Sequence, residues 1–360
     1  MTPMGGLRAG WTATSIRLPT PATRRVTRID YPDGSSVAYE YDELGRITGM
    51  RDAVTTTTYS YDAAGRVTGV GDADGFAIGY AYDAAGNITQ VTYPDGSTAT
   101  YAYDALNRLT SVTTSEGETA SYSYDAAGRL ASSTGFDEIA TTYTHDAAGR
   151  LTGMSSVVAS YFFTRDGNGR IVHSIETEPL APSPVASSTA YGYNDQKNRL
   201  LSAGAVAYGY DDEGQLTSAG PASYSYDYEH RLAAIGSDAR FAYDGRGNRL
   251  RATRGGVVKR YIYDPWGNLL AEADGDGNIT RTYIYGHGLL AMRTAGGDLY
   301  CYHFNTTGST IALTDATGGI VNSYAYDPFG NVLGQQESVS QPFKFVGQYG
   351  VMTEANDSLY

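Results

Sequence analysis

Hydrophobic and polar positions along this chain repeat in one short pattern, in which two tyrosines flank a small or polar residue and an aspartate follows. The stretch SYSYDAAGRL, with Tyr122, Tyr124 and Asp125, is typical. Residues two apart in a strand share one face, so Tyr122 and Tyr124 are expected to point the same way. Asp125 is expected to begin a chain reversal, because its carboxylate accepts hydrogen bonds from backbone N–H groups just ahead. Gly128 then supplies the positive φ angle of a tight turn, so the pattern predicts a β-hairpin.

The pattern recurs about a dozen times at nearly constant spacing. From Asp42 to Asp166, successive aspartates lie 20, 21, 21, 21, 21 and 20 residues apart. A second turn falls about ten residues after the first one, as in YPDG at 31–34 and 93–96. Alternating turns at this interval predict an all-β fold, in which tandem hairpins form a continuous antiparallel meander.

We interpret the recurring Asp, Gly and Arg as structural turn residues, because catalysis uses one site whereas architecture uses many. Asn107 replaces one glycine, and Asn is among the few residues that tolerate a left-handed backbone, so the role of this position is conformational. Each arginine is expected to cap its turn and to lie across the neighbouring hairpin. The predicted turn residues are Asp42, Gly45, Arg46, Asp62, Gly65, Arg66, Asp83, Gly86, Asp104, Asn107, Arg108, Asp125, Gly128, Arg129, Asp146, Gly149, Arg150, Asp264, Gly267, Asp327 and Gly330.

Two aliphatic residues three positions apart follow each turn, such as Leu109 and Val112. Positions three apart in a regular strand lie on opposite faces, so this spacing predicts apolar surface on both faces of the sheet. A sheet with neither face plainly polar is not half of a simple sandwich. The chain also has 32 tyrosines against 9 phenylalanines, which predicts layers that never become fully dry.

The repeats divide the chain into three parts. Residues 1–25 form an irregular lead-in without the apolar stretch of a signal peptide, and residues 26–258 carry the repeats, which degenerate around a Pro- and Ser-rich insertion near 178–190. Residues 259–360 are more individual in sequence. The net charge of −13 argues against a nucleic-acid partner, and no apolar run is long enough to span a membrane.

Candidate chemistry is sparse. Cys301 and His303 make a nucleophile pair conceivable, but same-face neighbours on one strand are usually packing partners, and one Cys with scattered His lacks the spacing of a zinc site. Asp274 and Asp276 resemble the start of a calcium loop, but Ile279 stands where the loop needs Gly, so a hairpin turn is favoured. We therefore expect no catalytic residue, no cofactor and no metal. Tyrosine ladders could stack on sugars, although packing between strands is favoured.

The unit Y-x-Y-D-x-x-G-R resembles the Rhs/YD-repeat family, which includes bacterial Rhs proteins, the B and C components of insecticidal toxin complexes and animal teneurins. YHFNTTGSTIALTD, YDPFGNVLG and FVGQYG in the last hundred residues resemble the Rhs-associated core, here truncated. Together the resemblance covers roughly residues 26 to 360. It implies hairpins that lie side by side and spiral into a partial hollow β-shell. The exposed strand edges of such a segment invite pairing with another chain.

The resemblance implies a non-enzymatic wall segment of a toxin-like protein that is secreted or at the cell surface. Its partners would be a C-terminal toxin cargo absent from this chain, which the wall encapsulates or presents, and the remaining shell segments. Relatives continue into a self-cleaving site, so we carry no cleavage residue over to this sequence. An alternative is a cell-surface adhesion or carbohydrate-binding module with a glycan or receptor as partner. A third is a hydrolase that uses Cys301 and His303.

Overall fold

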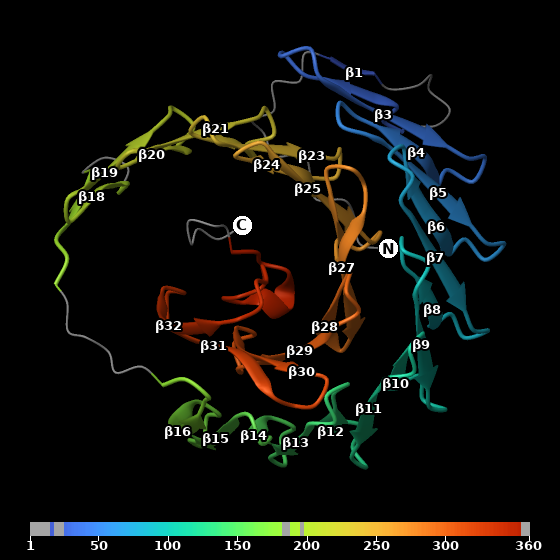
Figure 1. The fold of residues 1–360 in the computed structure, drawn as a ribbon, viewed down its shortest axis with the longest axis vertical. Helices are drawn as coiled ribbons and strands as arrows, with labels where there is room; N and C mark the ends of the chain where they lie inside the picture. The colour runs from blue at the N-terminus through green and yellow to red at the C-terminus, as the bar shows by residue number, and fades with distance from the viewer. Residues whose placement is uncertain (1–14, 18–24, 182–187, 195–197, 354–360) are drawn as a thin grey trace. The chain divides into compact units, whose positions relative to one another are not determined.

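The computed structural model describes residues 15–17, 25–181, 188–194 and 198–353. The predicted lead-in therefore lies outside the described residues, apart from residues 15–17 and 25, as does part of the predicted insertion. The described residues form two antiparallel sheets, and in each sheet the strands lie in chain order (Figure 1). The all-β class and the antiparallel meander of tandem hairpins are confirmed, whereas the spiral into a partial hollow shell stays a prediction.

The strands of the first sheet are β1 (Ser15–Arg17), β2 (Arg28–Asp30), β3 (Ser36–Tyr41), β4 (Ile47–Arg51), β5 (Thr56–Tyr61), β6 (Val67–Asp72), β7 (Ala77–Tyr82), β8 (Ile88–Thr92), β9 (Thr98–Tyr103), β10 (Leu109–Thr114), β11 (Thr119–Tyr124), β12 (Leu130–Thr134), β13 (Ala140–His145), β14 (Leu151–Ser155), β15 (Ser160–Arg165) and β16 (Ile171–Thr177).

The strands of the second sheet are β17 (Tyr191–Tyr193), β18 (Leu200–Ala203), β19 (Val206–Tyr210), β20 (Leu216–Ala219), β21 (Ala222–Tyr226), β22 (Leu232–Ile235), β23 (Ala239–Tyr243), β24 (Arg249–Arg254), β25 (Val257–Tyr263), β26 (Leu269–Asp274), β27 (Ile279–Gly286), β28 (Gly288–Thr294), β29 (Leu299–Phe304), β30 (Thr310–Asp315), β31 (Ile320–Tyr326) and β32 (Val332–Glu337). A single 3₁₀ turn, η1 (Gly347–Tyr349), completes the described elements, and none of these is a helix that could span a membrane.

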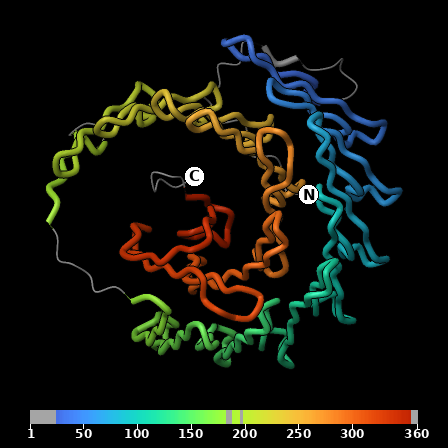
Figure 2. The backbone as a smooth tube through the Cα atoms, viewed as in Figure 1, coloured from blue at the N-terminus to red at the C-terminus, as the bar shows by residue number. Residues whose placement is uncertain are grey.

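The chain divides into two compact units, each with strands from both sheets. The first unit comprises residues 1–77, 186–267 and 273–278, and the second comprises residues 78–185, 268–272 and 279–360. Figure 2 traces the backbone, with residues of the first unit in blue and yellow and much of the second in green and red. Within each unit the tyrosine face of the first sheet is covered by strands of the second sheet, as the contacts described below show. The three-part division predicted from the sequence stays a prediction.

A bulge after each turn decides which side the aliphatic residues face. In β10, Leu109 lies opposite Tyr103 and Val112 lies opposite Tyr101, with a register shift after Leu109. Direct cross-strand partners point to the same face, so the shift places both aliphatic residues on the tyrosine face. Leu109 and Val112 are accordingly both buried. The prediction of apolar surface on both faces is therefore wrong, because it assumed a regular strand.

The strand before each turn has one polar and one buried face. In β11, Ala120 and Tyr122 are buried while Thr119, Ser121 and Ser123 are exposed. This alternation is typical of a sheet that is covered on one side and meets water on the other. The expectation of a sheet with neither face polar is wrong for this strand.

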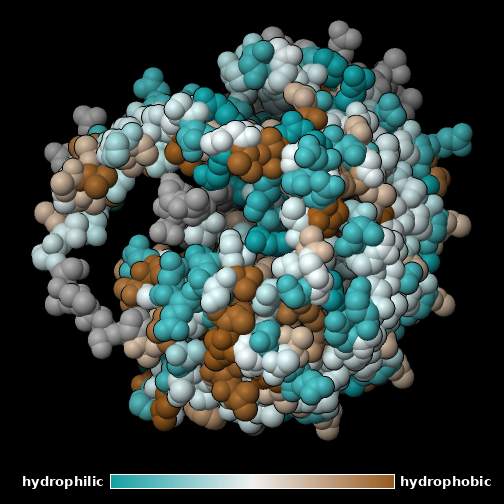
Figure 3. Space-filling model, in the orientation of Figure 1, coloured by the Kyte–Doolittle hydropathy of each residue, from teal (hydrophilic) through white to brown (hydrophobic). Residues whose placement is uncertain are grey.

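The second unit has a dry core. Tyr283, Tyr324, Leu313 and Phe343 have no exposed surface, and Tyr161 packs with Ile311 in a buried cluster. Figure 3 shows hydrophobic residues gathered over this unit, around the place of β29 and β30 in Figure 1. The prediction of layers that stay partly wet is thus wrong for this part of the core, where the hydroxyl of Tyr283 donates to Glu272 at 2.9 Å.

Candidate functional site: the repeated turn and the contacts between layers

Each turn is closed by its aspartate. The N–H of Gly128 donates to the carbonyl of Asp125 at 2.9 Å, and Gly128 has a φ of 81°. One carboxylate oxygen of Asp125 accepts from the backbone N–H groups of Ala127 and Arg129, both at 2.9 Å. The other accepts from Nε of Arg129 at 2.7 Å. The hydrogen bond from the Arg129 side chain is the main reason that the pKa of Asp125 lies below its usual value.

The same Asp–Arg arrangement occurs at Asp42, Asp62, Asp104, Asp146, Asp166 and Asp227. In other units Asn replaces this Arg: Nδ2 of Asn87 donates to Asp83 at 2.8 Å, and Nδ2 of Asn331 donates to Asp327 at 2.6 Å. A neutral amide thus fills the position of the guanidinium Nε.

Positive φ angles occur at every predicted position of the turn's last residue. They lie between 80° and 94° at Gly45, Gly65, Gly86, Gly128, Gly149, Gly267 and Gly330. Asn107 has a φ of 59°, and His230 and Asn198, which also stand where other units have Gly, have φ angles of 63° and 50°. At Asp264 the carboxylate accepts from the N–H of Trp266 at 2.8 Å.

Neighbouring hairpins are tied to one another by the second tyrosine of the unit. The hydroxyl of Tyr124 donates to the carbonyl of Leu109, one hairpin earlier, at 2.7 Å. The Arg108 guanidinium lies over the Tyr124 ring, 4.4 Å from its centroid. Arg129 extends the connection forward, because its Nη1 donates to the carbonyl of Asp146 at 2.9 Å. Each unit is therefore bonded to the units before and after it.

The tyrosine bond recurs from Tyr61 to Ile47, Tyr103 to Ile88, Tyr226 to Leu216, Tyr243 to Leu232, Tyr285 to Leu269 and Tyr326 to Thr310. Arg165 stands in place of this tyrosine in one unit and makes an equivalent bond, from Nη2 to the carbonyl of Leu151 at 3.1 Å. The sequence analysis missed this role of the hydroxyl. The preference for Tyr over Phe at this one position was the signal that pointed to it.

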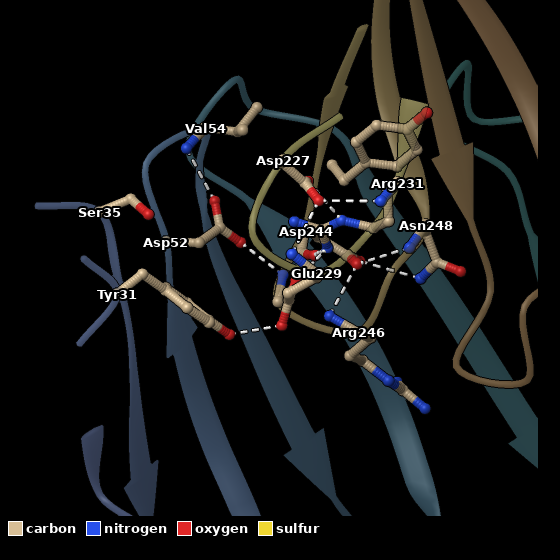
Figure 4. A network of polar contacts seen from close by, with 12 residues as sticks. Tyr31, Ser35, Asp52, Val54, Asp227, Glu229, Arg231, Asp244, Arg246 and Asn248 are labelled. Carbon is tan, nitrogen blue, oxygen red and sulfur yellow. Dashed lines mark hydrogen bonds and ion pairs between the residues drawn. The ribbon is translucent and has the colours of Figure 1, made fainter. Parts of the chain in front are cut away.

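The two layers of the first unit meet in a polar network (Figure 4). The hydroxyl of Tyr31 donates to Glu229, 198 residues away, and Glu229 also contacts Arg231. Asp52 accepts from the N–H of Gly245 at 2.9 Å through one oxygen, and from the N–H of Val54 through the other. Turns of the first sheet thus hold turns of the second.

The layers of the second unit meet at a buried carboxylate. Oδ2 of Asp137 lies 2.9 Å from Nε2 of His303 and 2.5 Å from Oγ1 of Thr314, and the Asp137 side chain has no exposed surface. Burial raises the pKa of Asp137, but the hydrogen bonds from His303 and Thr314 outweigh burial and leave the pKa below its usual value. The sequence analysis missed Asp137. Its signal was the stretch GFDE, where Glu138 at φ 61° takes the place of the Gly of a PDG turn.

The candidate nucleophile lacks the surroundings that a reactive thiol needs. Cys301 is 3% exposed, and burial raises the pKa of its thiol, which disfavours the thiolate. His303 is occupied by Asp137 and Thr314. A cavity of about 380 Å³ adjoins these residues and is lined largely by aliphatic and aromatic side chains, such as Met154 and Ile311.

The calcium-like stretch is a hairpin turn. Asp274 accepts from the N–H of Asp276 at 3.0 Å and from Nδ2 of Asn278 at 2.9 Å, and Gly277 has a φ of 91°. Its carboxylate thus closes the turn as Asp83 does. Within the part of the chain that the structure describes, no group of three or more His, Cys, Asp or Glu residues is placed to hold a metal ion.

Comparison with known proteins gives matches along most of the chain. The family model described as teneurin YD-shell matches residues 123–355, and the model described as RHS repeat matches residues 24–56, 54–77, 82–119 and 103–140. A segment of 142 residues, 38% of the chain, is 29% identical to the tRNA nuclease WapA of Bacillus subtilis (strain 168). A shorter one of 49 residues, 13% of the chain, is 45% identical to the tRNA(Glu)-specific nuclease WapA of Bacillus subtilis subsp. natto (strain BEST195). These segments span only 6% and 2% of the two nucleases.

Solved structures share the fold at low identity. The crystal structure of TcdB2-TccC3-TEV matches 93% of this chain with a TM-score of 0.62 at 14% identity. A structure of the Photorhabdus luminescens Tc holotoxin pore matches 94% with a TM-score of 0.57, also at 14% identity. The chain spans 24% of each of these solved chains.

Proposed function

Because this chain belongs to the teneurin YD-shell family, we propose that it is a wall segment of a YD-repeat shell that encloses or presents a polypeptide. The observation that carries the proposal is the repeated tie between hairpins, of which Tyr124 to Leu109 is one example. Ties of this kind extend a wall by repetition, with no single position that differs in kind from the others. Such a wall does its work by excluding other molecules, and the wall residues take no part in catalysis.

The partners follow from this role. The wall would associate with further shell segments and with a toxin cargo, and the whole protein would act outside the cell or at its surface. One of the similar solved structures is a Tc holotoxin pore, which supports this assignment. The net charge of −13 supports a protein partner rather than nucleic acid.

Protease protection tests the containment. An unstructured reporter is joined after Tyr360, and its digestion is compared with that of the same reporter added as a separate molecule. We expect the joined reporter to be digested several-fold more slowly. A variant that loses three ties, with Tyr61, Tyr103 and Tyr124 all changed to Phe, keeps the aromatic packing and is expected to lose protection. Equal digestion of joined and separate reporter would refute containment.

Adhesion is the second candidate, because several aromatic side chains of the first unit are open to solvent. Tyr191, Tyr193 and Trp266 are 59%, 54% and 57% exposed. Exposed aromatic rings are typical platforms for sugar rings. Binding to a glycan array that disappears when these three residues are changed to Ala, with protease protection absent, would favour adhesion over containment.

A further inference from the structure

The first sheet ends in an open strand. β16 is the last strand in the order of that sheet, and of the residues that the structure describes none pairs with its second edge. All seven of its residues are exposed. Figure 2 shows the hairpin of β15 and β16 at the end of the green strands, where the chain passes into the grey trace. An open edge carries unpaired N–H and C=O groups, which favour pairing with another strand.

The edge has only two of the features that usually prevent such pairing, the charged Glu176 and a bulge between Ile171 and His173. Its sequence, IVHSIET, contains no Lys, Pro or Gly. Ile171, Val172 and Ile175 are 49%, 62% and 56% exposed. Phe162 of β15 lies directly opposite Ile175 and is 47% exposed, so the two form a short apolar stripe beside the edge. Figure 3 shows hydrophobic residues at the place of β16 in Figure 1.

We propose that β16 pairs antiparallel with β16 of a second copy of this chain, about a twofold axis at Ile175. In this register Ile175 faces Ile175 of the second copy. Ser174 faces Glu176, so a hydroxyl meets a carboxylate, and His173 faces Thr177. Phe162 and Ile175 of one copy then continue into Ile175 and Phe162 of the other as one apolar stripe across the seam.

Neighbouring registers fit less well. A twofold axis at Glu176 sets two carboxylates against each other, and like charges directly opposite destabilise a strand pair. An axis at Ser174 sets Glu176 against the aliphatic Val172. β16 carries one charged side chain, Glu176, and the axis at Ile175 sets it opposite a serine and not opposite a second carboxylate. This self-association goes beyond the shell-wall function and does not depend on it.

Sedimentation velocity over a range of concentrations tests the pairing. We expect the whole chain to form a dimer and the Ile175→Lys variant, which sets two ammonium groups at the axis, to be a monomer. Val157→Lys is the matched control, because it adds the same charge at a position outside β16. Val157 lies in the same unit and is 89% exposed. We expect this control to remain a dimer. Circular dichroism and melting temperature show whether the variants are folded.

Disulfide trapping tests the register. Residues that face each other across a strand pair have Cβ atoms close enough for a disulfide to form. We expect Ile175→Cys to form a dimer under mild oxidation, and Ser174→Cys and Val157→Cys to do so far less, while the buried native Cys301 stays unreacted. A wild-type chain that is monomeric at every concentration would overturn the proposal and leave the edge to a strand of a different protein. A dimer that persists in Ile175→Lys would also overturn it, since the contact would then lie elsewhere.

Discussion

The two units place similar tyrosine-bearing strands against very different partners. In the second unit the covering strand β30 has five consecutive buried residues, Thr310 to Thr314. In the first unit the same sheet includes β20 and β18, four-residue strands of which no residue is buried, and β23, in which Ala239, Phe241 and Tyr243 are buried. The second unit therefore covers its tyrosine-bearing strands with a run of buried side chains, whereas the first combines a small apolar cluster of Tyr31, Val37 and Met50 with the polar network around Asp52 and Glu229.

The difference teaches that the repeat specifies a strand but not its environment. β30 reads TIALTD and β20 reads LTSA, so only the former offers enough aliphatic surface to exclude water. Stability in the second unit should then depend more on apolar packing than stability in the first, where hydrogen bonds and ion pairs between turns contribute as well. The predictions below test that difference, from the largest expected effect to the smallest.

Removing aliphatic side-chain volume should show the largest difference in stability loss between the two units. Leu313 has no exposed surface, so Leu313→Ala is expected to lower the free energy of unfolding by about 3 kcal/mol through the cavity that it leaves. Leu216→Ala, in the half-buried β20, is expected to cost only about 1 kcal/mol. Urea denaturation of both variants measures the two values. Equal losses would mean that Leu216 is packed as tightly as Leu313.

The buried carboxylate between the layers of the second unit should matter next. Asp137→Asn weakens the acceptor for His303 and Thr314 and is expected to cost about 2 kcal/mol. Asp95→Asn is the matched control, because Asp95 occupies an exposed second turn and bonds only Ser97. We expect the control to stay within about 0.5 kcal/mol of wild type. A loss in the control as large as that in Asp137→Asn would show that the interlayer contact contributes nothing.

The contribution of Asp137 also has a defined pH dependence. Its pKa is lower in the folded protein than in the unfolded chain, so its stabilisation is present above about pH 4 and is lost as the pH falls through the lowered value. The pKa shift of Asp244 in the first unit has the opposite sign, because burial raises this pKa. The folded state therefore favours the protonated form of Asp244. The difference in melting temperature between wild type and Asp137→Asn should shrink below pH 4. A difference that stays constant down to pH 2 would contradict this assignment.

The polar network of the first unit should show a smaller, pairwise effect. A double-mutant cycle with Tyr31→Phe and Glu229→Gln is expected to give a coupling energy of about 1 kcal/mol, because the hydrogen bond is only partly buried. Chemical denaturation of the two single variants and the double variant supplies the cycle. Additive losses would show that Tyr31 and Glu229 do not hold the layers together.

The smallest effect is expected in the turn itself. Arg129→Asn should leave the melting temperature almost unchanged, since Asn87 already fills this position beside Asp83 with the same bond to the carboxylate. The variant loses the hydrogen bond from Arg129 to the carbonyl of Asp146. We therefore expect faster amide hydrogen exchange at the start of the next hairpin. Arg129→Ala is the comparison variant, and it should be less stable than Arg129→Asn because the carboxylate loses its side-chain donor.

The sequence by itself determined the all-β class, the hairpin period and the positions of the turns. The reason is that these depend on short-range bonds, such as those from Ala127, Gly128 and Arg129 to Asp125. A residue that must adopt a positive φ is recognisable from its own identity, as at Gly128 and Asn107.

Only the tertiary structure decided which faces are dry. The bulge that turns Leu109 and Val112 to one face arises from pairing with the neighbouring strand, and no spacing rule for an isolated strand contains it. Asp137 contacts His303, which lies 166 residues further along the chain. The role of Asp137 therefore depends on which strands cover the first sheet. Contacts between layers join residues that the repeat period does not relate, which is why the turns were predictable and the interlayer contacts were not.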